Sequence, residues 1–379
     1  MKVLFLSQGQ RIEDHPGWNY SLEQLKKEGY ITDFFNIPYK GYVAQNGWLA
    51  FYRHIVELCR QNSFDIVLFH HFHGNSHAVS PRLCIKLLQA LPHKPIILTS
   101  CGDGFSDNWL APHYPEDFKE CSRAADITFS SQMGKAADIM TRWGAKNIVL
   151  TPLSMCPARF QAQHIDPMTH SFDFDVVSVG SRNVGRLPNP FNRNTYAVKT
   201  REKVMKALSK RYGSRFGLFG HGWKGLVSNQ GPIPFDQQQK VYRRGRVVVG
   251  GTPYSMTDYY ASNRPFFSIA SGVPTIELAV PRLEHILRDQ EHCYFCHSID
   301  EVIEQCDHLL KSDPVELYAK AARAADYIAE RHTQYHRLKF QLETANRYRE
   351  NENRLDVVFP FFLPEVNLVD EEKYAIRCK

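Results

Sequence analysis

Signatures of several well-known enzyme classes are missing from this sequence. It contains no G-x-S-x-G nucleophile elbow, no Gly-Lys-Ser or Gly-Lys-Thr phosphate loop and no H-E-x-x-H zinc motif. These motifs place the reacting groups of α/β-hydrolases, nucleotide triphosphatases and zinc peptidases, so those three functions lack support. The candidate catalytic and binding residues are therefore those that follow predicted strands or begin predicted helices.

Long apolar runs and paired cysteines are also lacking. The first ten residues hold a single lysine and a four-residue apolar run, which is too short for a signal peptide. No stretch approaches the ~20 apolar residues of a membrane span. Nine cysteines, with one close pair at Cys293 and Cys296, suit reduced thiols better than a disulfide framework. We expect a cytoplasmic protein with no membrane span and with no metal bound by that pair.

Length and composition predict an ordinary globular protein of two domains. A single hydrophobic core stops growing near roughly 250–300 residues, and this chain has 379, of which 43% are hydrophobic and 23% charged. The net charge of +6 permits an anionic substrate or a nucleic acid but demands neither. The basic run from Lys199 to Arg215 is typical of a solvated helix face.

Short apolar runs alternate with segments of helical periodicity, which predicts parallel sheets covered by helices. The alternation is lost after Thr151, in a stretch with several prolines, and it resumes near residue 174. The strands are expected at 3–7, 32–37, 64–71, 95–100, 127–131 and 147–152 in the first half, and at 174–181, 215–220, 246–251, 274–278 and 293–298 in the second.

The predicted fold class is therefore α/β, with two tandem Rossmann-like doubly wound domains facing a central cleft. The first domain is expected over 1–155, a linker over 156–172 and the second domain over 173–345. The tail, 346–379, is expected to pack back on the first domain. Because doubly wound sheets bind ligands at the carboxyl ends of their strands, the active site is predicted in the cleft.

Three residues of the first domain are candidates for acid–base chemistry. Asp103 follows the fourth predicted strand between two glycines, where it would face a substrate, although an Asp-Gly turn explains it equally well. Four histidines lie at the end of the third strand, namely His70, His71, His73 and His77. Strand geometry sends His70 and His71 to opposite faces. A general base such as His71 is therefore favoured over a metal site. Asp14 lies in the loop after the first strand, which also faces the cleft.

In the second domain, 219–225 contains a literal G-x-G-x-x-G after a strand. The helix and the acidic residue of a dinucleotide site do not follow, so this stretch is predicted to be a bare loop that a ligand can approach. The segment 179–183 offers donors suited to an anion, but it is equally typical of an exposed turn. Arg264 is placed at a helix start, where Asn263 can cap and Pro265 can open the helix, and its guanidinium suits phosphate.

From about Asp173 to Leu342 the chain resembles the CgeB-like, spore-maturation-protein type of glycosyltransferase. The matching pieces are FDVVSVGS, FGLFGHGW, RGRVVVGG, NRPFFSIASGVP, CYFCHSIDEVIEQCDHLL, DPVELYAKAARAADYIAERHT and YHRL, in that order. The first half matches through FDIVLFHH, PIILTSCGD, ADITFSS and WGAKNIVLTPLS. The resemblance implies a GT-B fold, in which the second domain holds a nucleotide-sugar donor and the first holds the acceptor and any catalytic base.

The resemblance also implies which residues meet the donor, a uridine diphosphate (UDP) sugar in most of the family. Gly180, Ser181 and Arg182 would line the diphosphate, and Arg264 would balance its charge without a metal ion or another cofactor. The loop Gly220, His221, Gly222 and Trp223 would lie on the nucleotide side of the cleft. Asp103, His71 or Asp14 would activate an acceptor hydroxyl if the reaction inverts the sugar.

One departure from the family concerns Phe267, which stands where the family has the glutamate expected at the donor ribose. Ser268, Glu277 or another group replaces that contact, or the donor binds differently, or donor binding is lost. A glycosyltransferase is the leading hypothesis, with modified DNA, a glycan, a lipid-linked glycan or a protein as possible acceptors. A nucleotide-sugar epimerase and an inactive cleft-binding protein remain alternatives, and the oligomeric state is open.

Overall fold

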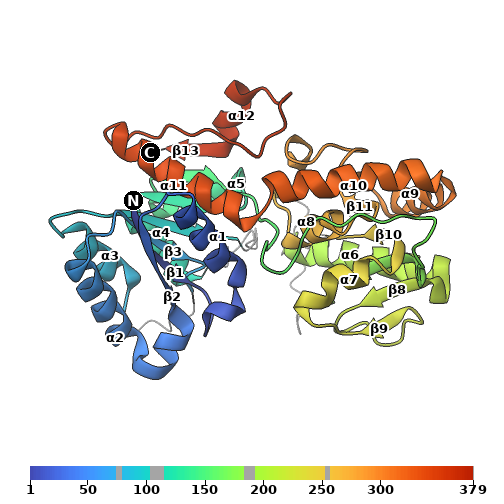
Figure 1. Ribbon diagram of the computed structural model, residues 1–379, viewed down its shortest axis with the longest axis horizontal. Helices are drawn as coiled ribbons and strands as arrows, with labels where there is room; N and C mark the ends of the chain where they lie inside the picture. The colour runs from blue at the N-terminus through green and yellow to red at the C-terminus, as the bar shows by residue number, and fades with distance from the viewer. Residues whose placement is uncertain (74–78, 103–114, 183–192, 252–256, 379) are drawn as a thin grey trace.

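The protein consists of two α/β units, each built on a twisted, mainly parallel sheet (Figure 1). The computed structural model describes residues 1–73, 79–102, 115–182, 193–251 and 257–378. Alternate residues of the first strand enter two separate apolar clusters, Val3 and Phe5 one, Leu4 and Leu6 the other. Both faces of that sheet are therefore covered, which is why its strands read as continuous apolar runs.

The first sheet has the order β13-β6-β5-β4-β3-β1-β2, and only β13 runs antiparallel. The chain moves from β1 to β2 on one side and then returns to β3 on the other. The switch point of this sheet therefore lies between β1 and β3. The strands are β1 (Lys2–Ser7), β2 (Asp33–Pro38), β3 (Ile66–His70), β4 (Ile96–Cys101), β5 (Ile127–Ser130), β6 (Asn147–Leu150) and β13 (Ile376–Cys378).

The second sheet has the order β12-β11-β10-β7-β8-β9, and its strands are parallel. Here the chain leaves β7 toward β8 and returns to β10, so the switch point lies between β7 and β10. The strands are β7 (Phe174–Val179), β8 (Phe216–Phe219), β9 (Asn229–Gly231), β10 (Gly245–Val249), β11 (Thr275–Leu278) and β12 (Tyr294–Cys296).

Helices connect these strands and cover the sheets. None in the described part of the chain has both the length and the apolar content that crossing a bilayer requires. They are α1 (Pro16–Lys27), α2 (Tyr39–Gln61), α3 (Pro81–Gln89), α4 (Glu116–Ala124), α5 (Lys135–Trp143), α6 (Arg193–Tyr212), α7 (Gln238–Tyr242), α8 (Asn263–Ala270), α9 (Ile299–Lys311), α10 (Pro314–Arg331), α11 (Gln334–Glu350) and α12 (Leu368–Ala375).

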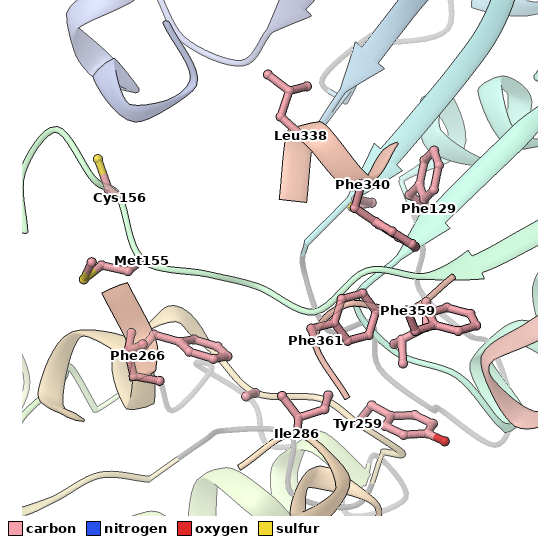
Figure 2. Packing of buried hydrophobic residues seen from close by; sticks show 14 of the residues in the cluster. Phe129, Met155, Cys156, Tyr259, Phe266, Ile286, Leu338, Phe340, Phe359 and Phe361 are labelled. Carbon is pink, nitrogen blue, oxygen red and sulfur yellow. The ribbon is translucent and has the colours of Figure 1, made fainter. Parts of the chain in front are cut away.

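The chain crosses between the two units twice, and the two crossings are hydrogen-bonded to each other. The Met155 amide donates to the carbonyl of His332 at 2.8 Å, and the Gln334 amide donates to the carbonyl of Met155 at 2.8 Å. Helix α11 then packs against α1 of the first unit. Figure 2 shows the apolar cluster around the crossings, where the ring of Phe340 of α11 lies against those of Phe129 of β5 and Phe361 of the tail.

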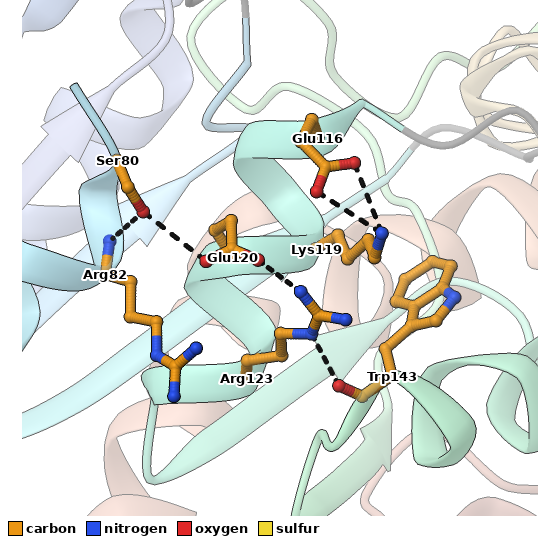
Figure 3. Close-up of polar contacts among 7 residues, drawn as sticks. All are labelled: Ser80, Arg82, Glu116, Lys119, Glu120, Arg123 and Trp143. Atoms are coloured by element: carbon orange, nitrogen blue, oxygen red, sulfur yellow. Dashed lines mark hydrogen bonds and ion pairs between the residues drawn. The ribbon is translucent and has the colours of Figure 1, made fainter. Parts of the chain in front are cut away.

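Polar contacts tie the outer helices of the first unit together (Figure 3). Ser80 caps α3 by accepting from the Arg82 amide at 3.2 Å, and its hydroxyl also donates to Glu120 of α4 at 3.4 Å. Glu120 pairs with Arg123, which donates to the Trp143 carbonyl at the end of α5 at 2.6 Å. These contacts hold α3, α4 and α5 in place around the sheet.

The structure confirms the predicted α/β class with two doubly wound sheets, although the domain limits stay a prediction. Two local features differ from the expectations. Ser262 rather than Asn263 is the N-cap residue of α8. The strands β9 and β13 were missed, because three-residue strands are too short to show a period.

Candidate functional site

The switch point of the second sheet brings two arginines to one glycine. Gly180 directly follows β7, and a Cβ placed there would lie 2.0 Å from Nη2 of Arg201 and 3.4 Å from Nε of Arg264. Any larger residue would displace these guanidinium groups. The bare backbone at Gly180 therefore lies against two cations at the edge where doubly wound sheets bind ligands.

Arg201 corrects the prediction that the basic run at the start of α6 is only a solvated face. Its side chain is 5% exposed, whereas Lys203 and Lys206 of the same helix are exposed. Burial, with the neighbouring charge of Arg264, lowers the pKa of Arg201 to about 9. The guanidinium is therefore still mostly charged at neutral pH, although its buried surroundings disfavour a positive charge without a countercharge.

Glu277 of β11 is the acidic member of this cluster. It is 1% exposed, and a Cβ on Gly250, which follows β10, would lie 1.7 Å from its Oε1 atom. Burial raises the pKa of Glu277 to about 8, and Arg264, Arg201 and the Gly251 amide only partly offset that rise. The carboxyl group is therefore largely protonated near neutral pH, and the cluster carries an excess of positive charge.

The predicted loop after β8 lies beside Gly180. A Cβ on Gly220 would lie 2.5 Å from the carbonyl oxygen of Gly180, and Trp223 donates its Nε1 hydrogen to that oxygen at 2.7 Å. The amide of His221 donates to the Ser181 hydroxyl at 3.3 Å, and its carbonyl accepts from the Arg182 amide at 2.8 Å. The loop leads to β9, and no helix begins at its glycines. A dinucleotide-binding fingerprint would need such a helix, so the structure agrees with the prediction of a loop.

Two further residues that were predicted to contact the sugar donor form bonds to other residues of the protein. The Arg182 guanidinium pairs with Glu202 of α6 at 2.9 Å. The Ser268 hydroxyl is buried and donates to the carbonyl of Pro265 within α8 at 3.1 Å. A Cβ on Gly222 would meet Cβ of Arg182 at 3.1 Å, so that glycine permits close packing of the two loops.

Phe267, the departure from the family pattern, belongs to the apolar core. Its ring is 1% exposed and lies 4.4 Å from the ring of Phe160 in the linker and 5.5 Å from that of Phe235, between centroids. The residue is therefore held by packing between α8, the linker and the segment before α7.

The first sheet presents the predicted acid–base candidates at its carboxyl edge. His71 follows β3, and its Nε2 atom accepts from the Gly102 amide at 3.1 Å. The Asp14 carboxylate accepts from the amides of Gln10 at 2.7 Å and Arg11 at 3.1 Å, which lowers the pKa of Asp14. Asp103 lies outside the described residues. The catalytic roles of all three stay predictions.

Three histidine rings at the end of β3 lie next to one another, 5.4 Å apart for His70 and His71 and 6.1 Å apart for His71 and His73, between centroids. Their ring nitrogens nevertheless have separate partners. His70 is buried, its ring stacks on Phe5, and its Nδ1 atom lies 2.7 Å from the Ser100 hydroxyl. His73 lies 2.8 Å from the Gln8 amide, between their Nε2 atoms, across the switch point of the first sheet. No group of three or more potential metal-binding side chains occurs among the residues that the structure describes. His77 lies outside them.

Comparison with protein families identifies the second half of the chain. Residues 199–343 match a family model described as glycosyl transferase-like. Over this segment the chain is similar to glycosyltransferases. The segment contains Arg201, Arg264 and Glu277, so the three charged residues of the cluster lie within the matched range. No curated protein matches the sequence.

Solved structures share the fold of this protein over nearly the whole chain. A glycosyltransferase from Rickettsia africae has a TM-score of 0.59 at 12% identity, covering 92% of this chain and 99% of that one. Sucrose-phosphate synthase from Thermosynechococcus elongatus has 0.54 at 12%, covering 93% and 100%. HepE from Anabaena, solved with UDP-glucose, has 0.52 at 11%, covering 91% and 100%. These similarities confirm the predicted GT-B fold.

The site residues that sequence reasoning missed are Arg201, Gly250 and Gly251. A Cβ on Gly251 would lie 3.2 Å from Cγ of Arg201, so both glycines after β10 are needed for the charged cluster to fit. The Gly-Gly pair at the end of a predicted strand was a usable signal. Nothing local distinguishes Arg201 from its basic neighbours, because its burial depends on the strand ends at Gly180 and Gly251.

Proposed function

We propose that the protein transfers a sugar from a UDP-sugar donor to an acceptor hydroxyl. The observation that carries the proposal is the pair of arginines against Gly180 at the switch point of a glycosyltransferase-like domain. Guanidinium groups match the geometry and charge of a diphosphate, and the glycine backbone allows it to approach closely. HepE, which shares the fold, was solved with UDP-glucose, and this supports UDP as the nucleotide.

The cluster suits the chemistry of a departing diphosphate. When the bond between the sugar and the diphosphate breaks, negative charge grows on the leaving oxygen. Arg201 and Arg264 are already positioned at the strand end and need no reorganisation to stabilise that charge. In this proposal the two arginines supply the charge without a metal ion, and Arg264, which is less buried than Arg201, lies nearer the ligand.

Residues at the end of the first sheet would bind and activate the acceptor. His71 and Asp103 follow neighbouring strands, β3 and β4, at the carboxyl edge, where one of them would take the acceptor proton if the reaction inverts the sugar. The Nε2 lone pair of His71 accepts from the Gly102 amide, so His71 can act at that atom only after this hydrogen bond opens. Asp103 is therefore the first residue to test as the base.

Calorimetric titration with UDP-glucose and UDP-N-acetylglucosamine tests donor binding. Arg264→Ala removes a charged hydrogen-bonding group worth about 1.5–3 kcal/mol, so UDP affinity should fall roughly 10- to 150-fold. Arg211→Ala is the matched control, because Arg211 is an exposed arginine of α6 that pairs with Asp307 at 2.6 Å. Equal affinity of wild type and Arg264→Ala would contradict the proposed donor site.

The reaction itself is followed by nuclear magnetic resonance of the protein incubated with each UDP-sugar. Release of UDP and free or transferred sugar supports a glycosyltransferase. A new isomer of the UDP-sugar would instead indicate the epimerase, and binding without any turnover would indicate an inactive cleft-binding protein.

A further inference from the structure

A second group of polar side chains lies at the carboxyl edge of the first sheet and has no partner. The hydroxyls of Ser131 and Thr151 and both polar atoms of the Gln132 amide are buried and make no hydrogen bond within the described part of the chain. Ser131 and Gln132 are each 1% exposed, and Thr151 is 8% exposed. Buried polar groups are normally satisfied, so four unpaired atoms in consecutive strand ends need an explanation.

The positions of these residues bring them together. Ser131 and Gln132 directly follow β5, and Thr151 directly follows β6, its parallel neighbour. The Thr151 amide donates to the Ser130 carbonyl at 2.7 Å, and the Ser131 amide donates to the Cys101 carbonyl at 3.3 Å. The ladder between the strands thus continues to these residues and fixes their backbones at one edge of the sheet.

The same edge faces the second unit. The amide of Met133, the residue after Gln132, donates to the Asp258 carbonyl at 3.3 Å. A Cβ on Gly134 would lie 2.4 Å from the Asp258 carboxylate, so the two units are in close contact here. The unpaired groups are therefore on the side of the first sheet where an acceptor would meet the donor.

We propose that Ser131, Gln132 and Thr151 bind a neutral, hydroxyl-rich ligand, namely a carbohydrate unit of the acceptor. The Gln132 amide can donate and accept hydrogen bonds, and so can the hydroxyls of Ser131 and Thr151. Sugar hydroxyls also donate and accept, so the three side chains suit them. The three side chains carry no positive charge to pair with phosphate. A glycan is thus favoured over DNA as the acceptor. This inference rests on the proposed function, since it assigns the acceptor of that reaction.

The test uses variants that remove the polar atoms but keep the volume. In Gln132→Leu and Thr151→Val the unpaired groups are lost, so the melting temperature should stay equal or rise, while carbohydrate binding should weaken at least 10-fold. Gln341→Leu is the matched control, because Gln341 is a buried glutamine of α11 whose Oε1 atom is also unpaired. It should bind carbohydrate like the wild type.

Binding is measured by saturation-transfer magnetic resonance on the full chain in the presence of UDP. The probes are the methyl glycosides of glucose, galactose and N-acetylglucosamine, and a DNA duplex. A glycoside signal that Gln132→Leu loses and Gln341→Leu keeps supports the proposal. It is overturned if no glycoside gives a signal, if Gln132→Leu keeps it, if both glutamine variants lose it, or if the DNA duplex binds in a manner that depends on Gln132.

Titration of the same samples with UDP-glucose separates this inference from the proposed function. If UDP-glucose binds and the glycosides do not, the carbohydrate site is wrong and the donor site stands. If the glycosides bind through Gln132 and UDP-glucose does not bind, the carbohydrate site stands and the proposed transfer reaction is wrong.

Discussion

At the scale of single residues, burial decides what the charged groups of the second unit do. Arg201 and Glu277 are both nearly inaccessible, and burial moves the pKa of each toward neutrality, downward for the arginine and upward for the glutamate. Their shared environment also includes Arg264, so the net charge of the cluster depends on whether Glu277 holds a proton. A diphosphate would bind best when it does.

The raised pKa of Glu277 predicts a pH-dependent stability. In the unfolded chain this carboxyl loses its proton near its ordinary pKa of 4.5, whereas in the folded protein it keeps the proton up to about pH 8. Its contribution is therefore fully present below pH 4.5 and is lost as the pH rises through about 8. The stability of the wild type relative to Glu277→Gln should fall between pH 5 and pH 8.

Urea unfolding at pH 5, 6.5 and 8 measures this difference. Glu57→Gln, which changes an exposed carboxylate of α2, provides the control and should give a difference from wild type that hardly varies with pH. A constant difference for Glu277→Gln would show that this carboxyl is ionised throughout the range.

At the scale of an element, α8 presents different sides to different parts of the molecule. Arg264 in its first turn reaches Gly180, whereas Phe266 stacks against His332 at the crossing between the units. Phe267 packs against Phe160 and Phe235. A helix this short has little stability of its own, so its packing holds Arg264 in place.

Restoring the family glutamate at Phe267 should therefore damage the protein. Phe267→Glu removes a buried ring, worth about 3–5 kcal/mol in comparable cores, and buries a carboxylate as well. Phe235→Glu should cost clearly less, because Phe235 belongs to the same ring cluster but is 43% exposed. Chemical denaturation measures both. If Phe267→Glu instead kept its stability and bound UDP more tightly, position 267 would face the donor after all.

At the scale of the whole molecule, the end of the chain connects the two units. Strand β13 extends the first sheet beside β6, whereas Glu371 of α12 pairs with Arg282 at 2.6 Å and with His285 at 3.1 Å in the second unit. Glu371 also accepts a hydrogen bond from Tyr259. The tail is thus attached to both units within a few residues of chain.

Breaking the polar attachment should loosen the tail without unfolding either sheet. Glu371→Gln leaves the partly buried Arg282 without its countercharge, and the expected loss of stability is about 1–3 kcal/mol, because solvent screens part of the interaction. Hydrogen exchange of α12 should increase while that of β1 and β3 stays unchanged. Asp370→Asn, an exposed neighbour on α12, is the control. Unchanged exchange in α12 would show that the apolar contacts hold the tail alone.

The sequence predicts the long elements of the fold better than the short ones. Strands such as β1 and β3 are continuous apolar runs bounded by turn residues, so periodicity locates them and the α/β class follows. The three-residue strands β9 and β13 carry no such pattern, because they form only by pairing with β8 and β6.

The candidate site was predictable where it depends on local chemistry. Gly180, Gly220 and Arg264 follow strands or open a helix, and their residue types alone suggest a close approach to an anion. Arg201 was not predictable, because it is one basic residue in a basic helix and is buried against strand ends, at Gly180 and Gly251, that no local pattern relates to it. The group at Ser131, Gln132 and Thr151 was not predictable either. Whether a polar side chain lacks a hydrogen-bond partner depends on its surroundings in the folded protein.

The sequence by itself determined the order of strands and helices, the two-unit α/β class and the strand ends where ligands bind, because these depend on local patterns. Only the tertiary structure decided which charged groups are buried, that Phe267 belongs to the core and that α11 packs on the first unit. The physical reason is that pKa shifts, unpaired polar atoms and close approaches arise from residues distant in the chain, whose juxtaposition no local pattern records.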